Sequence, residues 1–144
     1  MWQYANPFTM DIVVSADDTD RLGHTNNQVY IKWMEEISWR HIEQHGLTWD
    51  KQTQENRAMA IHRTDIEYLQ ASYEGDALVM ATWITSCERQ LTTSRHFQCV
   101  RPADGKTIIQ ANSHYVSIDL KTGKPARMPK WYQQTLQQLA IETQ

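Results

Sequence analysis

A long helical pattern near the start of the chain is the feature that most constrains the fold, because most of the sequence after it reads as strand. Apolar side chains at Tyr30, Trp33, Met34 and Ile37 recur at the spacing of one helix face, and Ile42 extends the pattern. One amphipathic helix among several strands buries its apolar face against a sheet. The pattern therefore predicts the α+β class.

Residues that are typical of helix starts and helix ends lie on the two sides of this pattern. Thr25 and Gln28 fit a capping box, in which a hydroxyl and an amide side chain satisfy two backbone N–H groups, and Asn26 is a competing cap. Gly46 follows the last periodic residue and fits the position after a helix, where glycine adopts a left-handed conformation. The sequence predicts a helix over about residues 26–45.

Strand patterns fill most of the chain after the helix. Runs rich in Val, Ile, Thr and aromatic residues are separated by turn signals at residues 73–75 and 102–105. Residues 47–57 are polar, with space for a short helical turn, and residues 130–142 predict a short C-terminal helix. Consecutive hairpins imply a five-stranded antiparallel sheet. The predicted strands are residues 11–16, 58–71, 76–87, 92–101 and 107–120.

The composition is that of one soluble domain over residues 1–144. A net charge of -3 without a basic stripe argues against a nucleic-acid partner. The apolar runs, such as residues 77–80, are far shorter than the roughly 20 residues of a membrane helix, and residues 1–10 do not resemble a secretory signal. Cys87 and Cys99 are too few for a disulfide framework, which indicates the cytoplasm.

The aromatic content and the expected sheet both favour an oligomer. Six Trp and six Tyr are many for 144 residues, and such side chains are common at subunit interfaces. A five-stranded sheet with one helix also leaves two strand edges without a partner. Pairing of identical subunits covers both kinds of surface, so we expect a homodimer or homotetramer.

The densest polar cluster, residues 17–27, lies between the first predicted strand and the helix. A helix start offers free backbone N–H groups and the positive end of the helix dipole, which can hold a developing oxyanion. Asp20, a few residues upstream, could attack a carbonyl or activate water, and Gly23 permits the tight bend that brings the two together. The cluster therefore predicts acyl-transfer chemistry.

The residues from Asp20 to Glu36, DRLGHTNNQVYIKWMEE, resemble the signature of hot-dog-fold acyl-CoA thioesterases. They are most similar to the 4-hydroxybenzoyl-CoA and long-chain acyl-CoA thioesterase group, and also to plant acyl-ACP thioesterases. Residues 67–76 and 116–129 look like the family's later strands, so the resemblance covers nearly the whole chain. It implies an antiparallel sheet wrapped around one long central helix, with active sites at the interface of a dimer whose sheets join edge to edge.

The resemblance also implies roles for individual residues. Asp20 matches the catalytic aspartate, as nucleophile or general base, and Asn27 matches the helix-start position whose N–H polarises the thioester carbonyl. His24 matches a histidine of the long-chain and acyl-ACP branches that orients water or the carboxylate. The expected substrate is acyl-CoA, with acyl carrier protein as a possible carrier and no cofactor or metal ion. The expected substrate-binding residues are Gly23, Asn26, Tyr30 and Tyr68.

Some positions depart from neighbouring branches of the family. The acyl-ACP branch carries Asn where this chain has Leu22, and no downstream Cys or Glu matches that branch. Glu35 and Glu36 lie deeper in the helix than the glutamate that another hot-dog branch uses. These departures favour the simpler scheme of Asp20 and a helix amide. An acyl-CoA hydratase or dehydratase and a non-catalytic acyl-CoA-binding protein remain alternatives.

Other chemically active residues lack a supporting pattern. His41 and His45 have the spacing of two zinc ligands, but no third ligand accompanies them. Neither cysteine lies near a histidine at a convincing spacing, and the nucleophile elbow of serine hydrolases is absent. Five basic residues could hold the phosphates of CoA without any being assigned: Arg63, Arg89, Arg95, Arg101 and Lys106.

Overall fold

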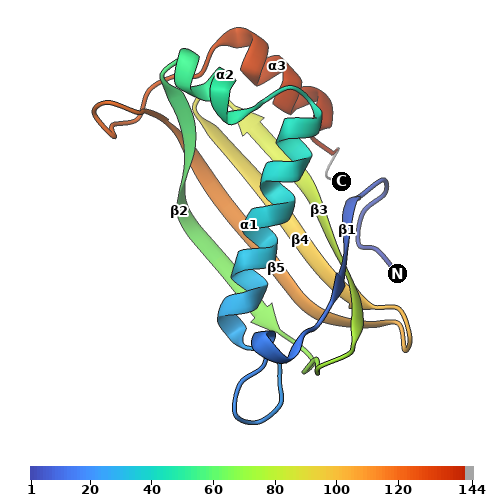
Figure 1. The fold of residues 1–144 in the computed structure, drawn as a ribbon. Helices are drawn as coiled ribbons and strands as arrows, with labels where there is room; N and C mark the ends of the chain where they lie inside the picture. Colours follow the sequence, from blue (N-terminus) through green and yellow to red (C-terminus); the bar gives the residue numbers. More distant parts are fainter. Residues whose placement is uncertain (142–144) are drawn as a thin grey trace. The chain divides into compact units, whose positions relative to one another are not determined.

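The computed structural model describes residues 1–141, and these residues form five strands, three α-helices and one short 3-10 helix (Figure 1). The predicted C-terminal helix reached residue 142, which lies outside the described residues. In chain order the elements are β1 (Phe8–Val13), η1 (Ala16–Asp18), α1 (Asn27–Gln44), α2 (Trp49–Gln54), β2 (Arg57–Tyr68), β3 (Ala77–Glu88), β4 (Thr92–Arg101), β5 (Lys106–Asp119) and α3 (Lys130–Leu139).

The strands form one antiparallel sheet in the order β1-β3-β4-β5-β2, which confirms the predicted five-stranded sheet with one long helix and a short C-terminal helix. The prediction of consecutive hairpins is wrong at one step, because β2 and β3 are not neighbours. The turn at Gly75 lies beside β1 instead, since Gly75 N–H donates to the carbonyl of Val14 at 2.8 Å. The edge strands are therefore β1 and β2.

The first strand begins and ends three residues earlier than predicted. Its register pairs Met10 with Met80 and Ile12 with Leu78 of β3. The sequence prediction rested on the Ile12–Val14 run, whereas pairing with β3 extends the strand back to Phe8. After the strand, the Ser15 N–H donates to the carboxylate of Asp18 at 2.9 Å, which closes the short η1 helix.

The boundaries of α1 follow the local signals closely. Asn26 is the cap, because its side-chain oxygen accepts the N–H of Gln28 at 3.1 Å. The prediction of a capping box formed by Thr25 and Gln28 is wrong, since Thr25 is buried and its hydroxyl contacts Ser72. At the other end, Gly46 is left-handed (φ 86°), and Leu47 N–H donates to the carbonyl of Ile42 at 3.0 Å, so the predicted stop is confirmed.

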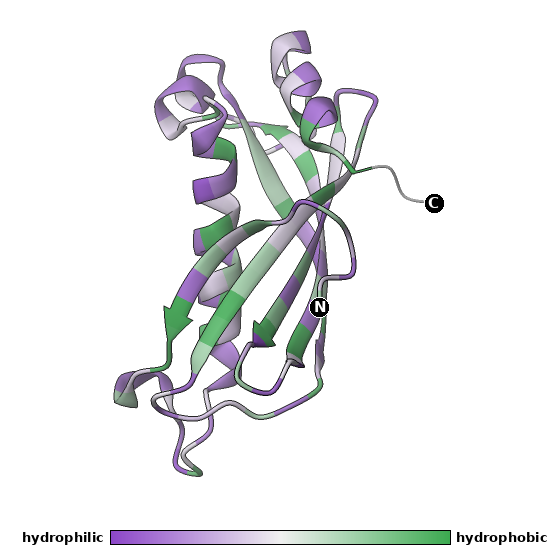
Figure 2. Cartoon of the chain, turned by 90° about the vertical axis from the view of Figure 1, so that its right-hand side faces the viewer, coloured by the Kyte–Doolittle hydropathy of each residue, from purple (hydrophilic) through white to green (hydrophobic). Residues whose placement is uncertain are grey.

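The chain forms two compact units, each with its own core. In the first unit (residues 1–39, 66–82 and 97–111), the predicted apolar face of α1 is buried among β-strand side chains. Figure 2 shows hydrophilic and hydrophobic residues alternating along α1, as expected for a helix with one buried face. The first core contains Met10, Ile12, Val14, Tyr30, Trp33, Met34, Ile37, Leu78, Met80, Phe97, Cys99, Ile108, Ile109 and Ala111.

The second unit contains residues 40–65, 83–96 and 112–141 of the described chain. Its core is built around α3 and the end of α1, with Leu47, Ile84, Cys87, Met128, Tyr132 and Leu136. Buried polar side chains accompany it, among them His41 and Arg95. The single domain over residues 1–144 stays a prediction.

Candidate functional site

Asp20, the candidate catalytic aspartate, lies at an exposed turn between η1 and α1. Its Oδ1 atom accepts the backbone N–H groups of Leu22 at 2.8 Å and His24 at 3.2 Å. Its backbone N–H donates to the carbonyl of His24 at 2.8 Å, and Gly23 takes the left-handed conformation (φ 78°) that this reversal requires. One oxygen of the Asp20 side chain therefore stabilises the turn that contains this residue, and Asp20 is exposed to solvent.

The start of α1 leaves one backbone donor without a protein partner. The Gln28 N–H is capped by the Asn26 side chain, and the Val29 N–H donates to the Asn26 carbonyl at 2.9 Å. Within residues 1–141, no hydrogen-bond acceptor lies at the Asn27 N–H, and Asn27 is exposed. This donor lies at the positive end of an 18-residue helix, so it can polarise a carbonyl oxygen brought to it.

Three buried hydroxyl groups lie beneath the helix start. The Ser72 Oγ is 2.6 Å from both Thr25 Oγ1 and the Tyr30 hydroxyl. All three residues are buried, and burial raises the pKa of Tyr30 above its ordinary value of 10.0. Since the phenol stays protonated at neutral pH, it acts here as a hydrogen-bond donor or acceptor and carries no charge.

His24 is held against the residue that follows Ser72. Its ring lies 5.2 Å from the ring of Tyr73, centre to centre, in an edge-to-face arrangement. The backbones of His24 and Tyr73 also form an isolated antiparallel bridge, and the Thr25 N–H donates to the Ser72 carbonyl at 2.8 Å. The turn that carries Asp20 is therefore attached to residues 72 and 73 through both backbone and ring contacts.

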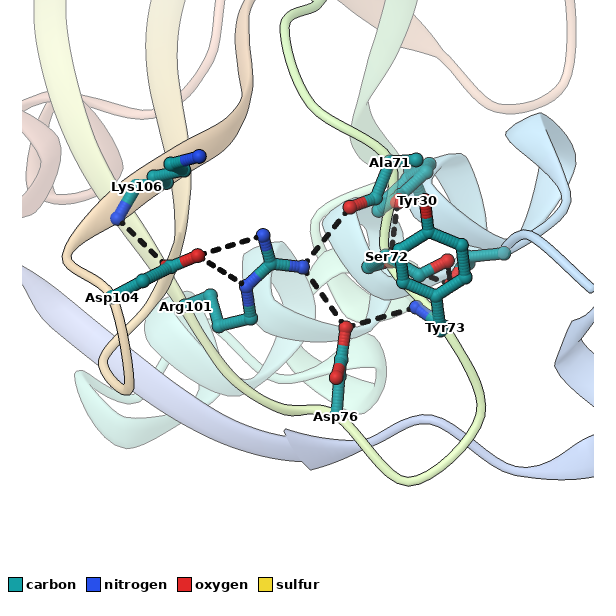
Figure 3. Close-up of polar contacts among 9 residues, drawn as sticks. Tyr30, Ala71, Ser72, Tyr73, Asp76, Arg101, Asp104 and Lys106 are labelled. Atoms are coloured by element: carbon teal, nitrogen blue, oxygen red, sulfur yellow. Dashed lines mark hydrogen bonds and ion pairs between the residues drawn. The ribbon is translucent and has the colours of Figure 1, made fainter.

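Arg101 anchors the segment that contains these residues (Figure 3). Its Nη1 donates to the Ala71 carbonyl at 3.0 Å and to Asp76 Oδ2 at 3.0 Å, while its Nη2 lies 2.9 Å from Asp104 Oδ2. Hydrogen bonds and ion pairs with both carboxylates raise the pKa of Arg101. The guanidinium stays charged at any ordinary pH and ties β4 to residues 71–76.

The structure brings some of the predicted site residues together and leaves others apart. Asp20 contacts His24 directly, and the ring of Tyr30 lies 6.0 Å from that of the half-exposed Tyr68. Among the described residues, no hydrogen bond or ion pair joins Asp20 to Asn27. The assignments of Asp20, Gly23, His24, Asn26, Asn27, Tyr30 and Tyr68 to catalysis or substrate binding stay proposals.

Sequence reasoning missed Ser72 and Tyr73. Both lie in the connection between β2 and β3, where no spacing rule links them to the loop before α1. The sequence suggests Arg101 only as one of five basic residues that could hold phosphates, whereas in the structure its guanidinium binds two carboxylates. Arg63 is similarly engaged by Asp65 at 3.0 Å.

The two cysteines have buried thiol groups that are poorly suited to nucleophilic chemistry. Both are free and buried, and burial raises the pKa of Cys99 to about 12. Burial also raises the pKa of Cys87. Neither forms the thiolate that a nucleophile needs at neutral pH. In the part of the chain that the structure describes, no three His, Cys, Asp or Glu side chains are grouped to hold a metal ion.

The family model of the thioesterase-like superfamily matches residues 14–136, which include the Asp20 turn, the start of α1 and the Arg101-anchored segment. A comparison with curated protein sequences found no match. Among the helices of residues 1–141, none combines the length and the apolar character that a membrane-spanning segment needs.

Three solved structures illustrate the shared fold. A 1,4-dihydroxy-2-naphthoyl-CoA thioesterase from Synechocystis is 19% identical, with a TM-score of 0.82 over 93% of this chain and 98% of that one. A Staphylococcus aureus protein in complex with CoA is 14% identical, with a TM-score of 0.86 over 96% and 89%. YbaW, a probable thioesterase from Escherichia coli, is 22% identical, with a TM-score of 0.76 over 92% and 98%.

At these identities the solved structures show the fold, which is the predicted hot-dog fold. The family model rests on the sequence itself and covers most of the chain. The chain belongs to the thioesterase-like superfamily.

Proposed function

We propose that this protein is an acyl-CoA thioesterase that hydrolyses a thioester to a free carboxylic acid and CoA. The observation that carries the proposal is the family match, because the matched residues include both an exposed carboxylate at Asp20 and an unpaired, exposed helix amide at Asn27. Two proteins of similar fold, a 1,4-dihydroxy-2-naphthoyl-CoA thioesterase and a protein in complex with CoA, favour CoA as the carrier. Acyl carrier protein is the second carrier to test.

The proposed chemistry needs one acid–base group and one oxyanion donor. The Asn27 N–H donates to the thioester carbonyl oxygen and stabilises the negative charge that develops there. The Asp20 carboxylate takes a proton from water, whose oxygen attacks the carbonyl carbon. The carbon–sulfur bond then breaks, and the CoA thiolate takes the proton back from Asp20. In the other route, the carboxylate attacks the carbonyl carbon itself, the carbon–sulfur bond breaks and the CoA thiolate leaves. Water then hydrolyses the resulting anhydride to the free acid and the Asp20 carboxylate, and the proton released from water goes to the thiolate.

The Asp20 turn leaves an oxygen for this role. Oδ1 accepts two backbone N–H groups, and those bonds hold the carboxylate in one orientation. The second oxygen has no hydrogen-bond partner among residues 1–141 and belongs to an exposed residue. In the proposal, His24, whose ring packs on Tyr73 beside this turn, orients water or substrate. Both features support Asp20 as the reacting group.

A homodimer is part of the proposal, since the resemblance implies active sites between subunits. The edge strand β2 supports it, because residues 61–65 of this strand are exposed and Ile61 is 56% exposed. An unpaired edge with exposed apolar side chains favours pairing with another strand. Light scattering, which measures the mass of the assembly, tests both the dimer and the association of two dimers into a tetramer. The two free, buried cysteines favour a reducing cytoplasm.

A thiol-release assay tests the proposed function directly. The purified protein is given a series of straight-chain acyl-CoA substrates and one aromatic acyl-CoA, with Asp20→Asn, which can keep both turn hydrogen bonds, as the matched inactive variant. The proposal expects thiol release from at least one substrate and loss of most turnover in the variant. Water addition to an enoyl-CoA without thiol release would indicate a hydratase. Tight acyl-CoA binding with neither reaction would indicate a non-catalytic binding protein.

A further inference from the structure

One buried side chain contacts residues on both sides of the Asn27 amide in the sequence. Ser72 is 0% exposed, and its Oγ lies 2.6 Å from Thr25 Oγ1 and 2.6 Å from the Tyr30 hydroxyl. Thr25 lies two residues before Asn27, and Tyr30 lies three residues after it, within the first turn of the helix. A single serine therefore holds the helix entry at two points that bracket the candidate oxyanion donor.

The hydroxyl groups of Tyr30, Ser72 and Thr25 can form a chain in which each one donates a hydrogen bond to the next group. The Tyr30 hydroxyl donates to Ser72 Oγ, the Ser72 hydroxyl donates to Thr25 Oγ1, and the Thr25 hydroxyl donates to the Ser72 carbonyl at 3.2 Å. That carbonyl also accepts the Thr25 N–H at 2.8 Å. The Ser72 and Thr25 hydroxyls then each donate one hydrogen bond and accept another, and the Tyr30 hydroxyl donates one, so all three buried groups are satisfied.

The residue next to Ser72 holds the other half of the proposed machinery. Tyr73 packs edge to face on the His24 ring and bridges the His24 backbone. The His24 N–H in turn donates to Asp20 Oδ1. Ser72 therefore contacts the residues around the helix start, and the next residue, Tyr73, contacts the Asp20 turn. Together they fix the position of the turn relative to the helix start.

This segment is itself fixed at both ends. Arg101 binds the Ala71 carbonyl and Asp76 Oδ2, both at 3.0 Å, as Figure 3 shows. Asp76 Oδ2 also accepts the Tyr73 N–H at 2.9 Å. Since Asp104 holds the guanidinium from the other side at 2.9 Å, the segment has little freedom to move away from α1.

We infer that Ser72 is a positioning residue for the thioesterase reaction, which orients the Asn27 N–H toward the carbonyl oxygen through Thr25 and Tyr30. The inference rests on the proposed function. The buried hydroxyls would then align the oxyanion donor in addition to stabilising the fold. Donors of this kind act in the transition state, so a misaligned amide lowers kcat more than it raises KM.

Thr25 offers a matched pair of substitutions that tests this role. Thr25→Val keeps the shape and removes the hydroxyl, whereas Thr25→Ser keeps the hydroxyl and removes a methyl group. We expect Thr25→Val and Ser72→Ala to lower kcat on the order of 10- to 100-fold, with KM within about threefold. We expect Thr25→Ser to keep kcat within about twofold of the parent chain. Each variant is assayed well below its own Tm.

The opposite pattern would overturn the inference. A merely structural hydroxyl network predicts a lower Tm in Thr25→Val and Ser72→Ala with kcat unchanged for the folded protein. If Ser72→Ala does not fold, the Thr25 pair decides alone, because Thr25→Val leaves the backbone bonds to Ser72 in place.

A second readout does not depend on turnover. In two-dimensional amide NMR of the full chain, the Asn27 signal should shift or broaden in Thr25→Val and keep its position in Thr25→Ser. An unchanged Asn27 signal in Thr25→Val contradicts the inference. If the parent chain releases no thiol from any acyl-CoA, the proposed function fails, and the NMR comparison still decides whether these hydroxyls orient the amide.

Discussion

The Oδ1 atom of Asp20 lies 2.8 Å from the backbone nitrogen of Leu22, so the carboxylate closes the turn in which it lies. It accepts the His24 N–H as well, at 3.2 Å. A purely structural aspartate would need only these bonds, while a catalytic one also needs its negative charge. Asparagine keeps the Oδ1 acceptor and lacks the charge, so one substitution separates the turn from the chemistry.

Removing the cap of α1 should destabilise the protein by a modest and measurable amount. Asn26→Ala loses the side-chain oxygen that accepts the Gln28 N–H at 3.1 Å. We expect the free energy of unfolding to fall by about 1 kcal/mol in urea denaturation. Asn26→Asp keeps the acceptor and should remain close to the parent chain. Equal losses in both variants would show that Asn26 acts through something other than capping.

His41 should make the stability of the fold depend on pH. Arg95 Nη1 lies 2.9 Å from His41 Nδ1, and a guanidinium can only donate, so the imidazole must be neutral with its lone pair on Nδ1. Burial, followed by the charges of Arg95 and His45, lowers the pKa of His41 from 6.5 to about 3. Below pH 6.5 the unfolded chain binds a proton here that the folded chain does not, so stability falls as pH falls toward 3.

The size of this effect can be measured by unfolding at two pH values. Each unit of pKa difference corresponds to about 1.4 kcal/mol, so His41 should cost about 2 kcal/mol at pH 5 relative to pH 7. His41→Asn places an amide oxygen near the Nδ1 position, cannot titrate, and should show a smaller loss between these pH values. The exposed His45→Asn is the control. If His41→Asn has the same pH dependence as the parent chain, the neutral buried imidazole is refuted.

The proposed dimer should depend on β2 and not on the other edge strand, β1. Ile61 of β2 is 56% exposed and Val13 of β1 is 70% exposed, so both can be changed to lysine without disturbing a core. We expect Ile61→Lys to shift the mass in light scattering from dimer toward monomer, since a charge would be buried in the edge-to-edge contact. Val13→Lys should leave the mass unchanged. The reverse pattern would place the contact on β1.

The local parts of the fold could be predicted from the sequence, because their determinants are close together in the chain. The helix stop at Gly46 and the burial of Trp33, Met34 and Ile37 follow from residue type and spacing alone. The same holds for β4, whose observed bounds, Thr92–Arg101, match the prediction. The cap was resolved only by the structure, since Thr25 is drawn away to Ser72 and Asn26 takes its place.

Long-range relationships could not be predicted in the same way. The separation of β2 from β3 depends on where the segment after β2 finds partners, and its Leu69 and Gln70 N–H groups both donate to the carbonyl of Ile108. The contacts of Ser72 with Thr25 and Tyr30 span 47 and 42 residues, and no local pattern encodes them. The sequence motif therefore indicates the candidate chemistry, whereas the contacts of the supporting segment, residues 71–76, arise only in the folded chain.

The steady-state turnover of Asp20→Asn with the best acyl-CoA substrate tests the central claim most directly. Asparagine can keep both turn bonds, so the variant should fold with an unchanged Tm and KM within about threefold. Loss of the carboxylate should lower kcat by at least about 100-fold, because neither proton transfer nor nucleophilic attack remains possible at this position. A kcat equal to that of the parent chain would contradict the account and leave Asp20 as a residue of the turn alone.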